Sequence, residues 1–135
     1  DFTPKPIPDE SGNGMHINLS LAMPKSEGAR DAFMAGLMEH ICEITVFLNP
    51  VDASYARLGE HKAPRYVTWS PENRSQLIRI PAAKGEYERL ELRSPDPAGN
   101  PYLAFAVILA AGADGIRTAY KLAQKNLILF HLSQA

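Results

Sequence analysis

The spacing of apolar residues changes along this chain, and that change most restricts the folds it can adopt. Between residues 15 and 21 they occupy every second position, which is typical of a strand with one buried face. Between residues 33 and 48 they recur every three or four positions, which is typical of an amphipathic helix. Both patterns within 135 residues indicate a fold that mixes strands with helices.

Two further strands are predicted in the second half of the chain. Residues 77–81 are short and apolar, and residues 87–93 alternate between apolar and charged side chains. The loop at 82–85 would join the two as a hairpin. The sequence therefore predicts an α+β fold in which an antiparallel β-sheet packs against helices.

Capping residues and loop residues indicate where the helices begin. Ser26 could cap the first helix, and Asn100 followed by Pro101 should start the second. The apolar run 102–113 is too short to span a bilayer, which needs about 20 residues, and we expect a buried helix there. Residues 57–69 contain a glycine and a proline and are expected to form a loop.

Composition excludes several classes of protein. Lys and Arg number 14 against 15 Asp and Glu, and no basic stripe indicates nucleic-acid binding. The single cysteine, Cys42, excludes a disulfide framework and suits a cytoplasmic protein. The first residue is Asp1, not an initiator Met, and no signal peptide follows. We therefore expect residues 1–135 to be a single partial domain from a longer polypeptide.

The polar faces of the predicted strands carry groups that suit a binding site. These residues are His16, Asn18, Ser20, Arg79, Arg89, Glu91 and Arg93. His16 and Glu91 could bind a divalent metal, and the planar guanidinium fork of arginine matches carboxylate and phosphate oxygens. Spacing alone leaves two simpler interpretations open: a surface salt-bridge ladder and an ordinary surface histidine.

Three blocks of the sequence resemble the glutamine synthetase family. They are residues 12–21, 73–81 and 89–97, the last followed by 100–104 and 111–116. Their order and spacing match the family, and the resemblance runs from Thr3 to Ile116. It implies the catalytic domain of an ATP-dependent ligase. In this family ATP phosphorylates the side-chain carboxylate of glutamate, and ammonia then displaces phosphate from the acyl phosphate.

The resemblance also implies roles for individual residues. His16 and Glu91 resemble two ligands of the Mg²⁺ or Mn²⁺ ion that bridges the nucleotide phosphates. The implied substrate-binding residues are Gly12, Arg57 and Arg93. The implied nucleotide-binding residues are Asn18, Ser20, Arg74, Arg79 and Arg89. Of these, Arg74 and Arg79 also resemble catalytic arginines that hold the transferred phosphoryl group. The implied partners are glutamate, ATP, ammonia and further copies of the chain in a ring-shaped homo-oligomer.

Two positions depart from the family pattern. The family has a mobile loop whose glutamate, just before Ala-Pro, closes the site and helps to deprotonate ammonium; here that place holds Lys62, and Glu60 lies two residues away. Because lysine would repel an ammonium ion, a γ-glutamyl–amine ligase that uses another amine is an alternative. Asn18 stands where a second histidine is common, and its amide still offers a donor and an acceptor.

The resemblance places other parts of the active site outside these residues. The family takes its remaining metal ligands, all glutamates, from upstream chain, and a neighbouring subunit's N-terminal domain closes each site. We therefore expect this piece alone to be inactive, to bind metal or nucleotide weakly at most, and to self-associate through open sheet edges. The residues also leave open a non-catalytic paralogue that acts as a binding or structural subunit, and an unrelated α+β binding domain. Retention of His16 and Glu91 argues against the paralogue.

Overall fold

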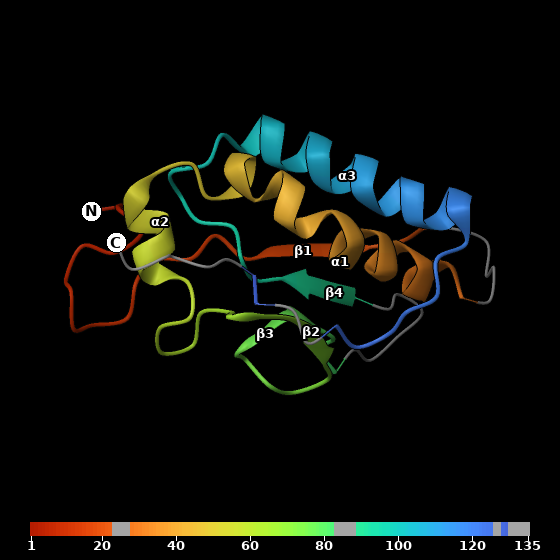
Figure 1. The fold of residues 1–135 in the computed structure, drawn as a ribbon, viewed down its shortest axis with the longest axis horizontal. Helices are drawn as coiled ribbons and strands as arrows, with labels where there is room; N and C mark the ends of the chain where they lie inside the picture. The colour runs from red at the N-terminus through yellow and green to blue at the C-terminus, as the bar shows by residue number, and fades with distance from the viewer. Residues whose placement is uncertain (23–27, 83–88, 126–127, 130–135) are drawn as a thin grey trace.

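The computed structural model describes residues 1–22, 28–82, 89–125 and 128–129 (Figure 1). Within them the strands are β1 Ile17–Ser20, β2 Tyr66–Ser70, β3 Gln76–Arg79 and β4 Arg89–Leu92. The helices are α1 Ala29–Leu48, α2 Asp52–Arg57 and α3 Pro101–Thr118. Figure 1 shows α1 and α3 side by side above the sheet, with α2 at one end of the molecule.

The strands form a mixed sheet in the order β1-β4-β3-β2. β4 is antiparallel to both of its neighbours, β1 and β3, whereas β2 and β3 are parallel. The α+β class is thus confirmed, but the prediction of an antiparallel sheet is wrong for one of the three pairings. The predicted hairpin pairs its two strands correctly, although residues 83–85 of its predicted loop and residues 87–88 of its second predicted strand lie outside the described residues.

The prediction of a loop at 57–69 is wrong at both ends of this range, because α2 ends at Arg57 and β2 begins at Tyr66. Residues 71–75 carry the chain back so that β3 runs in the same direction as β2. Parallel neighbours are usually joined by a crossover of a dozen or more residues, so nothing in the spacing favoured this pairing. Tyr66 also pairs with Ile128, which therefore lies at the outer edge of β2.

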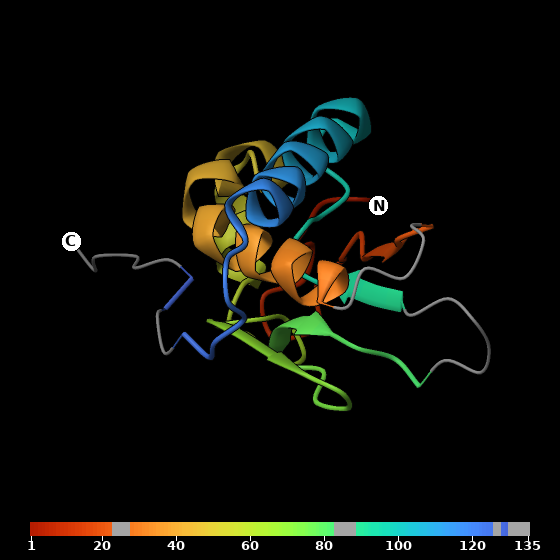
Figure 2. The same ribbon diagram turned by 90° about the vertical axis from the view of Figure 1, so that its right-hand side faces the viewer.

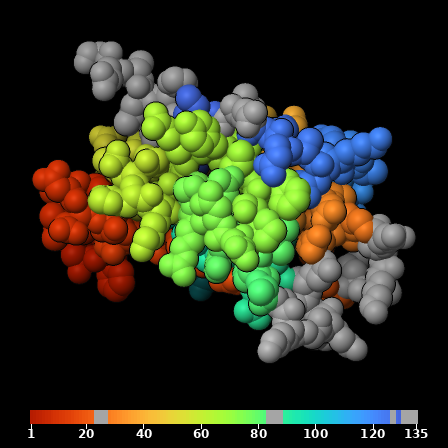
Figure 3. All heavy atoms as spheres, turned by 90° about the horizontal axis from the view of Figure 1, so that it is seen from below, coloured from red at the N-terminus to blue at the C-terminus, as the bar shows by residue number. Residues whose placement is uncertain are grey.

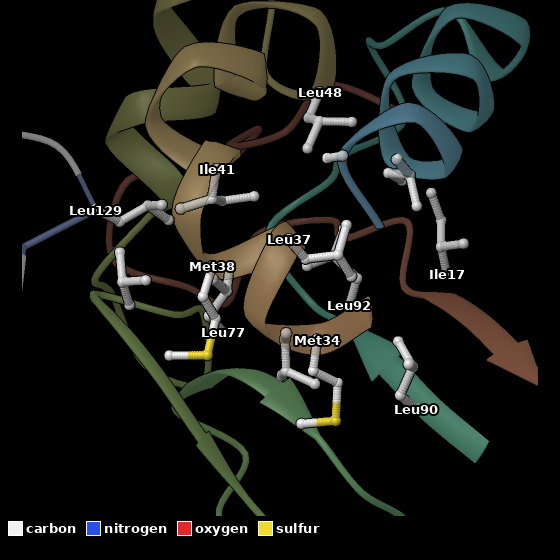
Figure 4. Close-up of a cluster of buried hydrophobic side chains, with 14 of the residues drawn as sticks. Ile17, Met34, Leu37, Met38, Ile41, Leu48, Leu77, Leu90, Leu92 and Leu129 are labelled. Atoms are coloured by element: carbon white, nitrogen blue, oxygen red, sulfur yellow. The ribbon is translucent and has the colours of Figure 1, made fainter. Parts of the chain in front are cut away.

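The main core lies between α1 and the sheet, and Figure 4 shows its side chains. Helical spacing along α1 aims one row of apolar residues at the strands, as the sequence predicted. Side chains that are at most 2 % exposed come from both layers: Met34, Leu37, Met38, Ile41, Leu77, Leu90 and Leu92. Each contributes about 1.5–3 kcal/mol by leaving water. The tail adds Leu129, which is 3 % exposed and lies in the same cluster.

Asn100 caps α3 as predicted: its Oδ1 accepts hydrogen bonds from the backbone N–H groups of Tyr102 and Leu103. The prediction that this helix is buried is wrong for one face. Leu103, Phe105 and Leu109 are each about half exposed. Figure 2 shows the reason, since α3 lies against α1 and away from the sheet. The predicted cap of α1 at Ser26 lies outside the described residues. Among the described helices, none has the length and hydrophobicity needed to cross a membrane.

The backbones of α1 and α3 touch at a pair of glycines. A Cβ atom added to Gly36 would lie 2.3 Å from the carbonyl oxygen of Ala111 and 2.8 Å from the Cα of Gly115. A Cβ atom added to Gly115 would lie 2.2 Å from the carbonyl oxygen of Ala32. All three distances are far shorter than van der Waals contact, so this crossing requires residues without side chains.

His40 links the same two helices through carboxylates. Its Nδ1 lies 3.1 Å from Glu43 Oε2 on α1, and its Nε2 lies 3.0 Å from Asp114 Oδ2 on α3. The hydrogen bond with Asp114, and then that with Glu43, raises the pKa of His40 above its usual value. Protonated His40 therefore stabilises the fold fully below about pH 6.5, and this stabilisation is lost as pH rises through the higher folded-state pKa.

The pH dependence of stability should report this link. We expect the free energy of unfolding to fall by less than about 1 kcal/mol between about pH 6 and about pH 9, because His40 is partly exposed. Urea unfolding at several pH values measures the change. The variant His40→Gln should flatten the curve over this range, and an unchanged curve would show that another group is responsible.

Candidate active site

Glu91 lies at the centre of the site because strand pairing brings three elements to it. It stands opposite Asn18 of β1 and opposite Arg79 of β3, and it is 6 % exposed. Its Oε1 lies 3.2 Å from Nδ1 of His16. Its Oε2 accepts hydrogen bonds from Arg79 Nε and, at 3.1 Å, from Arg93 Nη1. His16 and Glu91 therefore meet among arginines, as the sequence predicted.

The charges around Glu91 set the protonation of both groups. Burial alone would raise the pKa of Glu91, but hydrogen bonds from Arg79 and Arg93, together with their charges, lower it below its usual value. Burial and the nearby charge of Arg93 lower the pKa of His16, and Glu91 only partly opposes them. At neutral pH the pair is thus a carboxylate beside a neutral imidazole, which is the form that binds metal ions.

Arg93 joins the sheet to two loops. Its side chain is 5 % exposed; Nε donates to the carbonyl of Arg74 at 2.8 Å, and Nη2 donates to the carbonyl of Lys62 at 3.4 Å. A surface salt-bridge ladder would leave these charges in water. Glu91 and Arg93 are instead buried, and of the three charged residues on this strand face only Arg89 is exposed. The ladder interpretation is wrong.

Arg57 lies beneath the loop that contains Gly12. It is 3 % exposed, and its Nη2 donates to the carbonyls of Arg93, Ser94 and Pro95 at 3.3, 2.8 and 3.2 Å. Burial lowers the pKa of Arg57, and the Asp96 charge opposes this. A Cβ atom at Gly12 would lie 2.7 Å from Arg57 Cγ and 2.2 Å from the carbonyl of Pro4. Glycine is therefore required where these segments pack.

A pocket of ≈ 380 Å³ opens above Glu91. Its lining residues are Ser11, Gly12, Gly14, His16, Arg57, Glu60, His61, Lys62, Ala63, Arg74, Arg79, Glu91 and Arg93. Five of them are Lys or Arg and two carry carboxylates, so the pocket favours anionic ligands such as phosphate or carboxylate. Figure 3 shows the face away from the helices, where the segment around residues 60–80 lies beside the N-terminal residues.

Seven of the ten predicted site residues line this pocket, and three do not. The three are the nucleotide-binding candidates Asn18, Ser20 and Arg89, all of them exposed on β1 and β4. Ser20 pairs with Arg89 at the end of these strands that lies away from the pocket. Asn18 lies two residues nearer the pocket and pairs with Glu91.

Residues beside the predicted ones complete the lining. Ser11 and Gly14 belong to the glycine-rich segment before β1, and His61 and Ala63 flank Lys62. The backbone φ of His61 is 49°, which is unusual for a residue with a side chain. The sequence signals that could have indicated them were the Gly12-Asn13-Gly14 turn and the loop around Lys62.

The site fits part of a divalent metal centre. Glu91 Oε1 and the neutral His16 ring are suitable oxygen and nitrogen donors, and Glu91 Oε2 is held by arginines. Divalent ions such as Mg²⁺ take about six ligands. No group of three or more His, Cys, Asp or Glu able to hold a metal occurs in the described parts of the chain. With only His16 and Glu91, these residues would supply at most two ligands of such a set.

Fold and pocket together define an α+β domain with a cationic site built around a buried carboxylate. Residues 1–128 match the catalytic domain of glutamine synthetase, and the chain belongs to this family. The match extends past Ile116, where the resemblance was expected to end, into the tail that pairs with β2.

The relatives with known sequence or structure are similar over most of this chain. It is 45% identical to glutamine synthetase from Methanosarcina mazei over 98% of its length, and 46% identical to that from Thermus thermophilus over 85%. A cryo-electron microscopy structure of Plasmodium falciparum glutamine synthetase matches 99% of the chain with a TM-score of 0.79 and 29% identity. Apo GmaS without ligand matches 93% with a TM-score of 0.78 and 39% identity. The chain spans only 28% to 33% of the length of these four relatives.

Proposed function

We propose that the protein to which this chain belongs is an ATP-dependent ligase that makes glutamine from glutamate and ammonia through γ-glutamyl phosphate. The observation that carries the proposal is the environment of Glu91: one oxygen faces His16 and the other accepts from Arg79 and Arg93. A buried carboxylate, a neutral imidazole and several guanidinium groups in one pocket suit metal-assisted phosphoryl transfer to a carboxylate.

In this proposal each group of pocket residues has a separate task. His16 and Glu91 hold a Mg²⁺ or Mn²⁺ ion, which when bound would neutralise charge on the ATP phosphates. Arg74 and Arg79 stabilise the transferred phosphoryl group by position and charge. The Arg74 guanidinium suits this because it is exposed at the pocket and forms no hydrogen bond or ion pair with the described residues. Arg57 and Arg93 attract the glutamate carboxylates, with Gly12 allowing close approach.

Three nucleotide contacts are proposed on a neighbouring surface. Asn18, Ser20 and Arg89 lie exposed along β1 and β4, next to the strand positions that carry the pocket. ATP bound along these strands would reach the pocket with its phosphates. The remainder of the enzyme would add further glutamate ligands and a neighbouring subunit in a ring. We propose that this piece by itself lacks ligase activity and self-associates.

A second candidate, a γ-glutamyl–amine ligase, is favoured by Lys62. Its backbone carbonyl accepts from Arg93, and both Lys62 and Glu60 line the pocket. An ammonium ion entering beside Lys62 would meet a like charge in a pocket that is already cationic. At a separation of about 4 Å, such repulsion costs on the order of 1–4 kcal/mol, and only an amine that enters without charge avoids it.

An assay of the full-length protein with glutamate and ATP tests both candidates. Ammonium and several primary amines are compared as acceptors, in wild type and in Lys62→Glu. Glutamine formation by the wild type supports the first candidate; preference for an amine supports the second. We expect Lys62→Glu to raise kcat/KM for ammonium about ten-fold or more. A wild type that releases no phosphate with any acceptor would contradict both and favour the non-catalytic paralogue.

A further inference from the structure

The short segment that follows β4 connects the parts of the site. The backbone N–H of Met15, next to His16, donates to the carbonyl of Pro95 at 2.9 Å. Arg57 donates to three successive carbonyls of the same segment. Residues 93–96, here termed the β4 turn, therefore fix the position of His16 relative to Glu91 and Arg93.

The β4 turn depends on side-chain donors for its position. It leaves the sheet after Arg93, whose N–H makes its last bond to β3, at the carbonyl of Leu77. Pro95 has no backbone N–H, so it cannot be held by a ladder of strand hydrogen bonds. The backbone carbonyls of the turn are still available as hydrogen-bond acceptors, so donors from elsewhere in the fold must bind to them.

Asn49 supplies one of these donors from the end of α1. It is 0% exposed, and its Nδ2 donates at 2.8 Å both to the carbonyl of Ser94 and to Asp96 Oδ2. The N–H of Asp96 donates back to the carbonyl of Leu48, and Asp96 Oδ1 accepts from the N–H of Ala98. Asp96 is also 0% exposed. The two bonds from Asn49 Nδ2 are buried, and the loss of a partner is costly where water cannot replace it.

We propose that Asn49 and Asp96 are positioning residues for the site. The proposal rests on the proposed function, because it takes from there the metal-binding role of His16 and Glu91. The Asn49–Asp96 pair fixes the β4 turn against the end of α1, and the turn fixes Met15 and Arg93. Loss of the pair lets the turn shift, so that His16 and Glu91 no longer present their donors at the right separation. Neither residue lines the pocket.

Metal affinity of the full-length protein tests the proposal without turnover. We expect Asn49→Ala to raise the dissociation constant for Mn²⁺, measured by electron paramagnetic resonance, about ten-fold. The matched control is Thr45→Val, one turn earlier on α1. Thr45 is buried, and its hydroxyl bonds only to the carbonyl of Ile41, away from the turn. The control should lower Tm comparably and leave Mn²⁺ affinity unchanged; equal affinities in both variants would overturn the proposal.

A second variant covers the case in which Asn49→Ala does not fold. Asp96→Asn keeps the size of the side chain but leaves one acceptor oxygen in place of two, so the turn loses either the bond from Asn49 Nδ2 or the bond from the N–H of Ala98. Its Mn²⁺ affinity should fall in the same direction, and an unchanged affinity would overturn the proposal. A wild type that binds Mn²⁺ yet forms no glutamine refutes the proposed function alone, and the positioning role is then judged by the affinities. A wild type without Mn²⁺ binding overturns both.

Discussion

Replacing Glu91 with alanine should have the largest effect of any single change in the pocket. The variant removes the only carboxylate that pairs with Arg79 and Arg93 in the described residues. Because the Arg93 side chain is 5 % exposed, its charge would stay buried with backbone carbonyls as acceptors but without a carboxylate to balance it. Breaking such a pair costs roughly 3–5 kcal/mol. Urea unfolding followed by circular dichroism should record a loss of this size.

The same variant should also remove metal binding and activity from the full-length protein. We expect glutamine formation to fall by about 10²–10³-fold or more. The matched control is Glu60→Ala, because Glu60 lines the same pocket but is exposed. The control should change stability by no more than about 0.5 kcal/mol. If the variant loses the expected stability but keeps normal metal affinity, then the role of Glu91 is structural only.

Replacing Gly36 with valine should separate the two long helices. A side chain there would meet the backbone of α3 at 2.3 Å, and backbone atoms cannot rotate aside as a flexible side chain does. Overpacking of this kind costs about 1–3 kcal/mol and occasionally more. We expect the upper end or beyond, since Gly115 faces Gly36 and neither helix can yield without losing its neighbours in the core.

The control for this variant lies on the same helix pair. Ala110→Val places the same side chain at an exposed position of α3, so it should cost about 0.5 kcal/mol or less. Thermal unfolding of the two variants beside wild type measures the difference. If Gly36→Val were as stable as Ala110→Val, the contact between the helix backbones would have to be looser than the structure indicates.

The sequence predicted those features that depend on nearby residues. The alternation before Leu21 placed His16, just before β1, on the side of that strand's polar face. The same period placed Glu91 of β4 and Arg93, just after it, on one side. The Asn100 cap was equally local. Each of these follows from one strand or one helix end, where spacing and geometry are directly related.

What the sequence did not predict depends on contacts between distant segments. β2 is a strand because β3 and Ile128 pair with it, and its own pattern is weak. The hydrogen bonds from Arg57 Nη2 to backbone carbonyls of the β4 turn join positions 36 to 38 apart, so local spacing did not indicate them. The part played by Asn49 was invisible for the same reason, because Asp96 lies 47 positions away along the chain.

The outer side of α3 has a consequence for handling the chain. Four large side chains on this side of the helix are 48–83 % exposed: Tyr102, Leu103, Phe105 and Leu109. The opposite side of the helix packs in the core. Each 100 Å² of apolar surface that stays in contact with water forgoes about 2.5 kcal/mol of hydrophobic stabilisation. We therefore expect aggregation in dilute buffer to begin at this helix as readily as at the sheet edges. Charged substitutions at these four positions should make the chain more soluble.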